Sequence, residues 1–443
     1  EGGCPRWPIS PEEHVTEPAE AQWPTPATFP QRGIGKDELL ADLVANRHDD
    51  ADWRAGRLFS LIYHPDNPEL EDALAAVSRE YLAENALNPF RFPSLARLER
   101  ETADMVADLL HGTPSAGGLT SGGTESILVA VYVARELARE RGNSDPVIVT
   151  GITAHPAFAK ACHLLGIEQV RVSVGPDHRI DVNALANALD DRTAMVVASA
   201  PNYPFGVIDP VEQIASIAAE RGILCHVDAC LGGMLLPFWE RLGEPVPPWD
   251  FRVAGVTSIS ADIHKYGYSY KGASVLLHRN PNNYAKQWWF DDGAWGGGLY
   301  GSPTPAGTRP APPIAGAWAA LRFLGADGYL EMARVVRDTR DLLLRGIEQI
   351  DGLRVAHRPD LSIFEVGSDE LDIAAVGDAL IEAGWYPDRQ PGGLHFMLSP
   401  FHAKVARDLL AALAAAVSTV REGRTSDGAT ATYGSAGPSG AQA

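Results

Sequence analysis

Between residues 147 and 278 the sequence alternates short apolar runs with stretches of helical character. The apolar runs lie at 147–150, 170–174, 194–200, 223–228 and 274–278. Helical stretches at 156–165, 182–189 and 210–221 separate most of them. Parallel strands need crossover connections and are buried on both faces, so they read as continuous apolar runs with helices between them. The alternation therefore predicts an α/β fold, a mostly parallel sheet covered by helices.

The flanking segments differ from this central region in composition and in pattern. A helix is predicted at 94–111, and a second one begins with Thr124 as its N-cap and ends at Gly142. Beyond residue 320, helices at 329–350, 371–383 and 402–421 accompany strand candidates near 353–357, 362–366 and 394–398, which predicts a smaller α+β domain. The predicted division is an N-terminal arm and helix (1–54), a large domain (55–320), a small domain (321–423) and a disordered tail (424–443).

The composition excludes several classes of function. The formal net charge of −20 argues against nonspecific binding to nucleic acid or to an anionic membrane. No apolar run approaches the roughly 20 residues that span a bilayer, and no apolar segment follows residues 1–6 as in a signal peptide. The four cysteines form no CxxC pair, so neither a disulfide framework nor a metal site is predicted, and a cytoplasmic setting is expected.

Four features at predicted strand ends or helix starts of the large domain carry the chemistry, because α/β folds bind ligands there. Gly122-Gly123-Thr124 opens a helix, where glycines permit close approach and free N–H groups suit a phosphate. Asp228 ends a buried strand, where a carboxylate needs a positive partner such as a protonated ring nitrogen. His155 follows another strand and could stack on a flat cofactor. Lys265, between His264 and Tyr266, suits a Schiff-base lysine.

Each feature has a plainer interpretation when it is taken alone. The glycine-rich turn could be an ordinary helix cap, and Asp228 could cap a helix or pair with a basic side chain. His155 could be a loop histidine without a special role, and a lone lysine is normally just exposed to solvent. Their order along one α/β domain is what favours a cofactor site.

That order resembles the fold-type I pyridoxal-phosphate enzymes, specifically the group II decarboxylase superfamily and, within it, sphingosine-1-phosphate lyases and their soluble bacterial relatives. The matching segments are SGGTES (121–126), PNYPFGVIDPVEQIA (201–215), HVDACLGG (226–233), ADIHKYGYSYKG (261–272) and YGSPTPAGTRP (300–310). The resemblance covers roughly residues 55–400. It implies pyridoxal 5′-phosphate (PLP) as the cofactor.

The resemblance also implies roles for individual residues. Lys265 would form the Schiff base, Asp228 would pair with the pyridine nitrogen, and His155 and Cys230 would contact opposite faces of the ring. The cofactor phosphate would be held by Gly123, Thr124 and His264, and by Gly301 and Ser302 of a partner subunit, which implies a homodimer with active sites at the subunit interface. Lys271 and Tyr63 match residues that are linked in the family to substrate phosphate and, for the lysine, to proton transfer.

The chain departs from the lyase pattern in two places. Asn88 and Phe90 stand where the lyases have His and Asp, and Gly307-Thr308-Arg309-Pro310-Ala311 replaces a GSRPG pattern. These changes lie outside the cofactor motifs. They predict weaker selectivity for a substrate phosphate, and they are compatible with a smaller or non-sphingoid substrate.

The function implied is cleavage of the Cα–Cβ bond of a β-hydroxyamine, with or without a phosphate group, to an aldehyde and a shorter amine. The same cofactor motifs would serve an L-amino-acid decarboxylase, in which the bond to the carboxylate breaks instead. A non-catalytic binding protein on the same fold is a third interpretation, which the joint presence of Lys265, Asp228 and His155 opposes.

Overall fold

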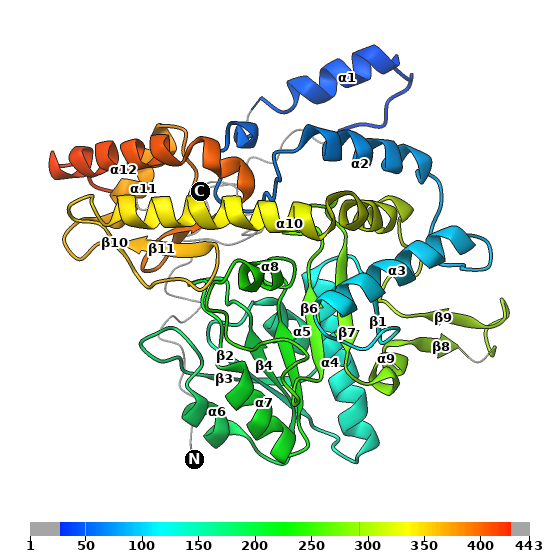
Figure 1. The fold of residues 1–443 in the computed structure, drawn as a ribbon. Helices are drawn as coiled ribbons and strands as arrows, with labels where there is room; N and C mark the ends of the chain where they lie inside the picture. The colour runs from blue at the N-terminus through cyan, green and yellow to red at the C-terminus, as the bar shows by residue number, and fades with distance from the viewer. Residues whose placement is uncertain (1–26, 49, 292, 427–443) are drawn as a thin grey trace.

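A computed structural model describes residues 27–48, 50–291 and 293–426, and its centre is a seven-stranded sheet (Figure 1). The strand order is β1-β7-β6-β5-β4-β2-β3, in which β2 to β6 are mutually parallel and β7 is antiparallel to both its neighbours. The strands are β1 (Gly117–Thr120), β2 (Val147–Gly151), β3 (Glu168–Val172), β4 (Thr193–Ser199), β5 (Leu224–Asp228), β6 (Ser258–Ala261) and β7 (Ser274–His278). The mostly parallel α/β sheet expected from the sequence is therefore confirmed.

Helices cover both faces of this sheet. Ile148 and Met195 pack with residues of α4 and α5, whereas their neighbours Val149 and Val196 point into the core on the opposite face. Burial on both faces explains why these strands read as continuous apolar runs. The helices up to β8 are α1 (Lys36–Ala45), α2 (Pro68–Glu80), α3 (Pro93–Leu109), α4 (Gly123–Glu140), α5 (Ala157–Leu165), α6 (Val182–Ala188), α7 (Val211–Glu220), α8 (Leu236–Arg241) and α9 (Pro281–Gln287), with a 3₁₀ turn at Trp53–Ala55.

A second, four-stranded antiparallel sheet of order β10-β11-β13-β12 lies in the C-terminal part of the chain. Its elements are β10 (Arg354–Val355), β11 (Ile363–Gly367), α11 (Ile373–Glu382), β12 (Asp388–Gln390), β13 (Gly393–Met397), a 3₁₀ turn (Pro400–Lys404) and α12 (Ala406–Arg421). The long helix α10 (Ala311–Ile347) connects the two sheets and is kinked at Gly325. The predicted domain boundary at residue 320 falls inside this helix. The two-domain division remains a prediction.

Most predicted elements agree with the structure to within a few residues, but the N-cap assigned to Thr124 is wrong. Helix α4 begins at Gly123, and its N-cap is Gly122, which has no side chain to cap it. The first-turn N–H groups of a helix have no intrahelical acceptor. Without a capping side chain, the groups at this end stay available for another acceptor. The predicted tail falls almost entirely outside the described residues.

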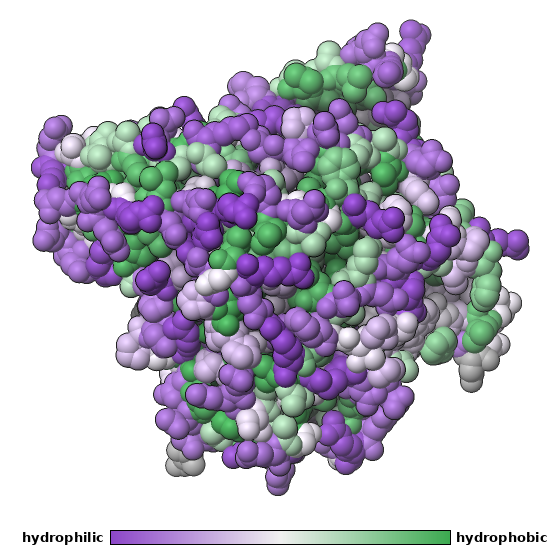
Figure 2. All heavy atoms as spheres, viewed as in Figure 1, coloured by the Kyte–Doolittle hydropathy of each residue, from purple (hydrophilic) through white to green (hydrophobic). Residues whose placement is uncertain are grey.

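Two segments project from the body with apolar side chains exposed. Helix α1 has no buried residue, and its Leu39, Leu40, Leu43 and Val44 form an apolar band (Figure 2). The β8–β9 hairpin, formed by β8 (Trp289–Asp291) and β9 (Tyr300–Ser302), carries exposed Trp289, Phe290, Trp295 and Leu299 (Figure 1). Among the helices that the structure describes, none combines the length and apolar character required to cross a membrane.

Candidate active site

A cavity of about 450 Å³ lies at the edge of the seven-stranded sheet where the parallel strands end. Loops after β2, β4, β5 and β6 surround it together with the start of α4. Seven of the predicted site residues line it: Gly123, Thr124, His155, Asp228, Cys230, His264 and Lys265. A cavity of about 640 Å³ adjoins it and shares His155 and Tyr203, and one of about 760 Å³ lies beside the β8–β9 hairpin. The 450 Å³ cavity, here called the lysine cavity, is the one that contains Lys265.

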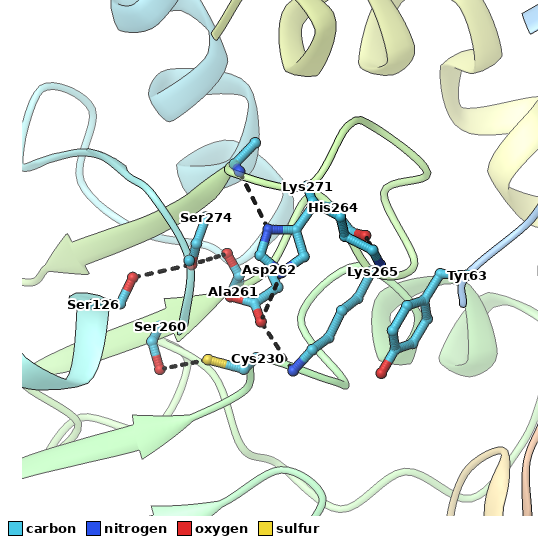
Figure 3. Close-up of polar contacts among 12 residues, drawn as sticks. Tyr63, Ser126, Cys230, Ser260, Ala261, Asp262, His264, Lys265, Lys271 and Ser274 are labelled. Carbon is cyan, nitrogen blue, oxygen red and sulfur yellow. Dashed lines mark hydrogen bonds and ion pairs between the residues drawn. The ribbon is translucent and has the colours of Figure 1, made fainter. Parts of the chain in front are cut away.

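Lys265 follows β6 in a loop and points its amino group into the lysine cavity (Figure 3). Its Nζ lies 2.9 Å from Oδ2 of Asp262, a carboxylate that is almost completely buried. Burial is the largest single effect and lowers the pKa of Lys265, but the charge and hydrogen bond of Asp262, together with Tyr63 and Cys230, outweigh it, so the pKa lies well above its ordinary value. Lys265 is therefore an ammonium near neutral pH in the structure as it stands.

The loop that carries Lys265 is held from the C-terminal side of the molecule. The hydroxyl of Tyr266 donates to the carbonyl of Leu398 at 2.7 Å and lies 2.6 Å from Oγ of Ser362. The Tyr329 hydroxyl, on α10, donates to the carbonyl of Gly267 at 2.8 Å. These contacts fix the two residues that follow the lysine in the loop.

Asp228 ends β5 and is buried, with 7% of its surface exposed. Its Oδ1 accepts hydrogen bonds from the backbone N–H of Cys230 at 3.1 Å and from the Ser260 hydroxyl at 3.4 Å. Nearby His226 cannot supply a positive charge, because burial lowers its pKa to about 4. The carboxylate thus lies on the wall of the lysine cavity, fixed by neutral donors.

His155 lies in the loop between β2 and α5. Its Nδ1 accepts the backbone N–H of Ala157 at 3.1 Å, which assigns a hydrogen to Nε2 when the ring is neutral. Burial lowers the pKa of His155, despite the opposing charge of Asp228. The side chain is therefore a neutral, flat ring at the cavity wall, as stacking on a cofactor requires.

The start of α4 provides a cradle for an anion. A Cβ atom added to Gly123 would lie 2.7 Å from Sγ of Cys230 and 3.0 Å from the Asp262 carboxylate oxygens, so only glycine fits there. His264 closes the opposite side; its Nδ1 accepts the N–H of Ala273 at 3.2 Å, and burial lowers its pKa to about 4. Free helix N–H groups beside a neutral imidazole suit a phosphate.

Lys271 and Tyr63 lie together near this loop. The Lys271 Nζ is 4.7 Å from the centre of the Tyr63 ring and donates to the carbonyl of His264 at 3.3 Å. Although Lys271 as a residue is exposed, burial of its amino group, reinforced by the charge of Lys265, lowers its pKa to about 8. Near neutral pH this cation is close to losing its proton.

Gly301 and Ser302 do not line the lysine cavity of their own chain. They lie on β9, beside the cavity of about 760 Å³ that Asn88, Phe90 and Arg309 also border. Arg309 is buried and forms an ion pair with Glu99, and the Asn88 side chain accepts the N–H groups of Phe90 and Arg91 at 3.0 and 3.1 Å. Within one chain, these residues are separate from the catalytic candidates.

Asp262, Tyr203 and Ser199 are among the cavity residues that were not assigned a role from the sequence. Asp262 is in the ADIHK segment, three residues before Lys265, but that spacing reveals a contact only once the loop conformation is known. Tyr203 donates to Asp388 at 2.7 Å and so links the cavity to the smaller sheet. Among the described residues there is also no cluster of His, Cys, Asp or Glu that could hold a metal ion.

A cavity with a lysine, a strand-end carboxylate, a flat neutral ring and a helix N-terminus has the groups needed to hold a phosphorylated aromatic aldehyde. Comparison with known proteins also indicates a cofactor of this kind. The model of the pyridoxal-dependent decarboxylase conserved domain matches residues 69–304. The protein is therefore an enzyme that depends on PLP.

Similar proteins show to which family of PLP-dependent enzymes the chain belongs. Rat sphingosine-1-phosphate lyase 1 is 41% identical over 381 residues, which cover 85% of this chain and 67% of the relative. The rice sphingosine-1-phosphate lyase is 38% identical over 414 residues, covering 90% and 76%. The solved structure of Burkholderia pseudomallei sphingosine-1-phosphate lyase superposes with a TM-score of 0.86 at 38% identity, over 91% of this chain and 95% of that one. The chain belongs to the sphingosine-1-phosphate lyase family and is a PLP-dependent lyase, which rules out the non-catalytic interpretation.

Proposed function

We propose that this lyase cleaves the Cα–Cβ bond of a phosphorylated β-hydroxyamine, with Lys265 as the residue to which the cofactor attaches. The observation that carries the proposal is the arrangement of Lys265 and Asp228 in one cavity with the Lys271–Tyr63 pair beside the lysine loop. When bound, PLP supplies an electron sink for the bond that breaks at Cα. All other contributions come from side chains of the protein.

In this proposal the residues that line the lysine cavity bind different parts of the cofactor. Asp228 keeps a proton on the pyridine nitrogen, because a buried carboxylate favours a neighbouring cation. His155 stacks on one face of the ring and Cys230 contacts the other. Gly123, Thr124 and His264 hold the cofactor phosphate at the start of α4.

Lys271 and Tyr63 are proposed to bind the substrate phosphate. A single exposed cation contributes about 1 kcal/mol or less to holding an anion, whereas a charge-assisted contact in a closed site is roughly twice as strong as a neutral one. Asn88 borders the same cavity as Gly301 and Ser302 and would, like them, approach from the partner chain; it is a neutral donor where the family has His. We therefore propose weaker selectivity for phosphate than in lyases that keep the histidine.

Changing pH should expose the role of Lys271. Its amino group is charged below a pKa of about 8 and neutral above it. The KM for a phosphorylated β-hydroxyamine should therefore rise by about tenfold between pH 7 and pH 9, the loss of one charge-assisted contact. Lys271→Ala should show the higher KM at both pH values and retain the cofactor spectrum, whereas Lys271→Arg should show the low KM at both. A KM that is independent of Lys271 would contradict this assignment.

The alternative function is decarboxylation of an L-amino acid. The L-aspartate decarboxylase of Thermococcus kodakarensis is 29% identical over 382 residues, and the glutamate decarboxylase of Lactobacillus brevis shares the fold at 21% identity with a TM-score of 0.77. The two reactions differ in products. Incubation with phosphorylated β-hydroxyamines and with plain amino acids, analysed by mass spectrometry, should yield an aldehyde from the former. Release of carbon dioxide from an amino acid, with no aldehyde from any β-hydroxyamine, would replace this proposal with the alternative.

We also propose a homodimer in the cytoplasm, in which Gly301 and Ser302 of each chain reach the cofactor phosphate of the other. The proposal is supported by the separation of these two residues from the lysine cavity of their own chain and by the apolar side chains exposed on the β8–β9 hairpin. The proposed location in the cytoplasm, a reducing compartment, is supported by the free thiols of Cys162, Cys225 and Cys230.

Mixed dimers test this assembly. Lys265→Ala and Gly301→Glu should each be inactive, the second because it places a negative charge beside the partner's cofactor phosphate. Co-folding equal amounts should restore about a quarter of wild-type activity, since half of the dimers are hybrids and each hybrid contains one intact site. Light scattering should report a dimer. Absence of any recovery, together with a monomer of full wild-type activity, would refute the proposal.

A further inference from the structure

Asp262 is the first residue after β6 and lies directly beneath the start of α4. Its side chain is 2% exposed, and its Oδ2 lies 2.9 Å from Nζ of Lys265 and 3.6 Å from Nε2 of His264 (Figure 3). Gly123 packs so closely against it that a Cβ there would lie 3.0 Å from both carboxylate oxygens. Asp262 is thus held in a fixed position with its charge directed at the lysine.

The hydrogen bonding of this carboxylate is unlike that of a purely structural ion pair. Its Oδ1 is buried and has no hydrogen-bond partner among the described residues. A buried acceptor without a donor costs free energy, and a buried ion pair adds stability only when its remaining lone pairs are satisfied. The contacts of Asp262 are therefore directed mainly at Lys265, with His264 and the Ser274 hydroxyl as the other groups that favour its charged form.

The charged and titratable groups around Lys265 come from several elements. They are Asp262, His264, Tyr266 and Lys271 in its own loop, Asp228 and Cys230 at the end of β5, His155 after β2, Tyr203 after β4, Glu125 in the first turn of α4, and Tyr63 from the N-terminal part of the chain. Burial tends to raise the pKa of Asp262, yet Lys265 and His264 bring it below its ordinary value. Of these groups, Asp262 is the carboxylate in direct contact with Nζ.

We infer that Asp262 is a positioning residue that holds Lys265 as an ammonium directed into the lysine cavity and then balances the positive charge on the nitrogen that links Lys265 to the cofactor. The inference rests on the proposed attachment at Lys265. It goes beyond that proposal by assigning the counter-charge to a residue other than Asp228.

The balance of atoms and charge agrees with this role. Nζ of Lys265 forms a double bond to the aldehyde carbon of the cofactor, the aldehyde oxygen leaves as water, and two of the three ammonium protons leave with it. One proton and one positive charge stay on Nζ. If a substrate ammonium then took over the bond, the two protons that its nitrogen gives up would go to Nζ, and Asp262 would again hold Lys265 as an ammonium. A single fixed carboxylate thus serves the nitrogen before, during and after attachment.

The test is a pH titration of the visible absorption of the bound cofactor in the wild-type holoenzyme and in Asp262→Asn. Loss of the counter-charge should move the transition of the linking nitrogen to lower pH by at least one unit. The matched control is Asp250→Asn, which removes a carboxylate that is also buried and pairs with Arg252 at 2.9 Å, outside the lysine cavity. Its transition should coincide with that of the wild type.

Borohydride reduction and peptide mapping separate this inference from the proposed function. Attachment at Lys265 in both proteins with an unchanged transition would overturn the role of Asp262 and leave the proposed function intact. Attachment at another lysine would overturn both.

A measurement on the wild type alone covers the case in which Asp262→Asn does not fold. In the full chain stripped of cofactor, the pH dependence of lysine acylation should have its midpoint above pH 10.5 at Lys265 and near pH 8 at Lys271. The midpoint, unlike the rate, does not depend on how accessible each amino group is. A midpoint for Lys265 below that of an ordinary lysine would refute the inference.

Discussion

Lys265→Ala should lower turnover by at least about three orders of magnitude, as removal of a covalent catalytic group commonly does. It should also abolish the borohydride-stable attachment of the cofactor. Peptide mapping after reduction and a product assay measure the two effects. Lys160→Ala, which changes an exposed lysine on α5, is the control and should retain both properties. A reduced adduct found on any lysine other than Lys265 would contradict the assignment.

The same substitution leaves the buried Asp262 carboxylate without its cation. Breaking a buried ion pair by removing one partner typically costs about 3–5 kcal/mol, so the melting temperature of Lys265→Ala should fall. The double variant Lys265→Ala/Asp262→Asn should regain part of the lost stability and none of the activity. This pattern would separate the loss of chemistry from any loss of folding.

Asp228→Asn is expected to have the second large effect. The variant keeps the shape of the side chain and should bind cofactor, but it removes the charge that retains the proton on the pyridine nitrogen. The loss of electrostatic stabilisation should lower the rate on the order of a hundredfold or more. Cofactor content by absorbance and turnover on the same preparation measure binding and rate separately. Near-normal turnover would show that Asp228 does not have this role.

The sequence predicts four of the five parallel strands, and β2, β4 and β5 read as apolar runs because both of their faces are buried. It does not predict β6 (Ser258–Ala261), the strand before the lysine loop. It misses β1, whose Gly117 is dictated by packing: a Cβ there would lie 2.5 Å from the carbonyl oxygen of Leu276. Close approach of two backbones selects glycine, which has no strand preference that a pattern could reveal. It also misses the beginning of α10, where Pro312 and Pro313 read as a loop although proline is accepted in a first helical turn.

The residues of the candidate site likewise fall into those that the sequence predicts and those that only the structure reveals. Lys265, Asp228, His155 and Gly123 are identified because each stands at the end of an element in a recognisable order. Asp262 and Tyr203 depend on the loops after β6 and β4, whose conformations are set by contacts with residues far away in the sequence. The separation of Gly301 and Ser302 from the lysine cavity likewise depends on how the β8–β9 hairpin projects from the body.

The contacts that hold the lysine loop have a consequence for how the molecule comes apart. Tyr329 of α10 donates a hydrogen bond to the loop that carries Lys265, and the carbonyl of Leu398 in the C-terminal region accepts one from it. A chain ended at residue 320 would lose both contacts and would be cut within α10, and the core would be exposed where the rest of this helix packs its apolar side chains. The seven-stranded sheet and the four-stranded sheet should therefore denature as one cooperative unit, and neither should be obtainable as a separate stable fragment.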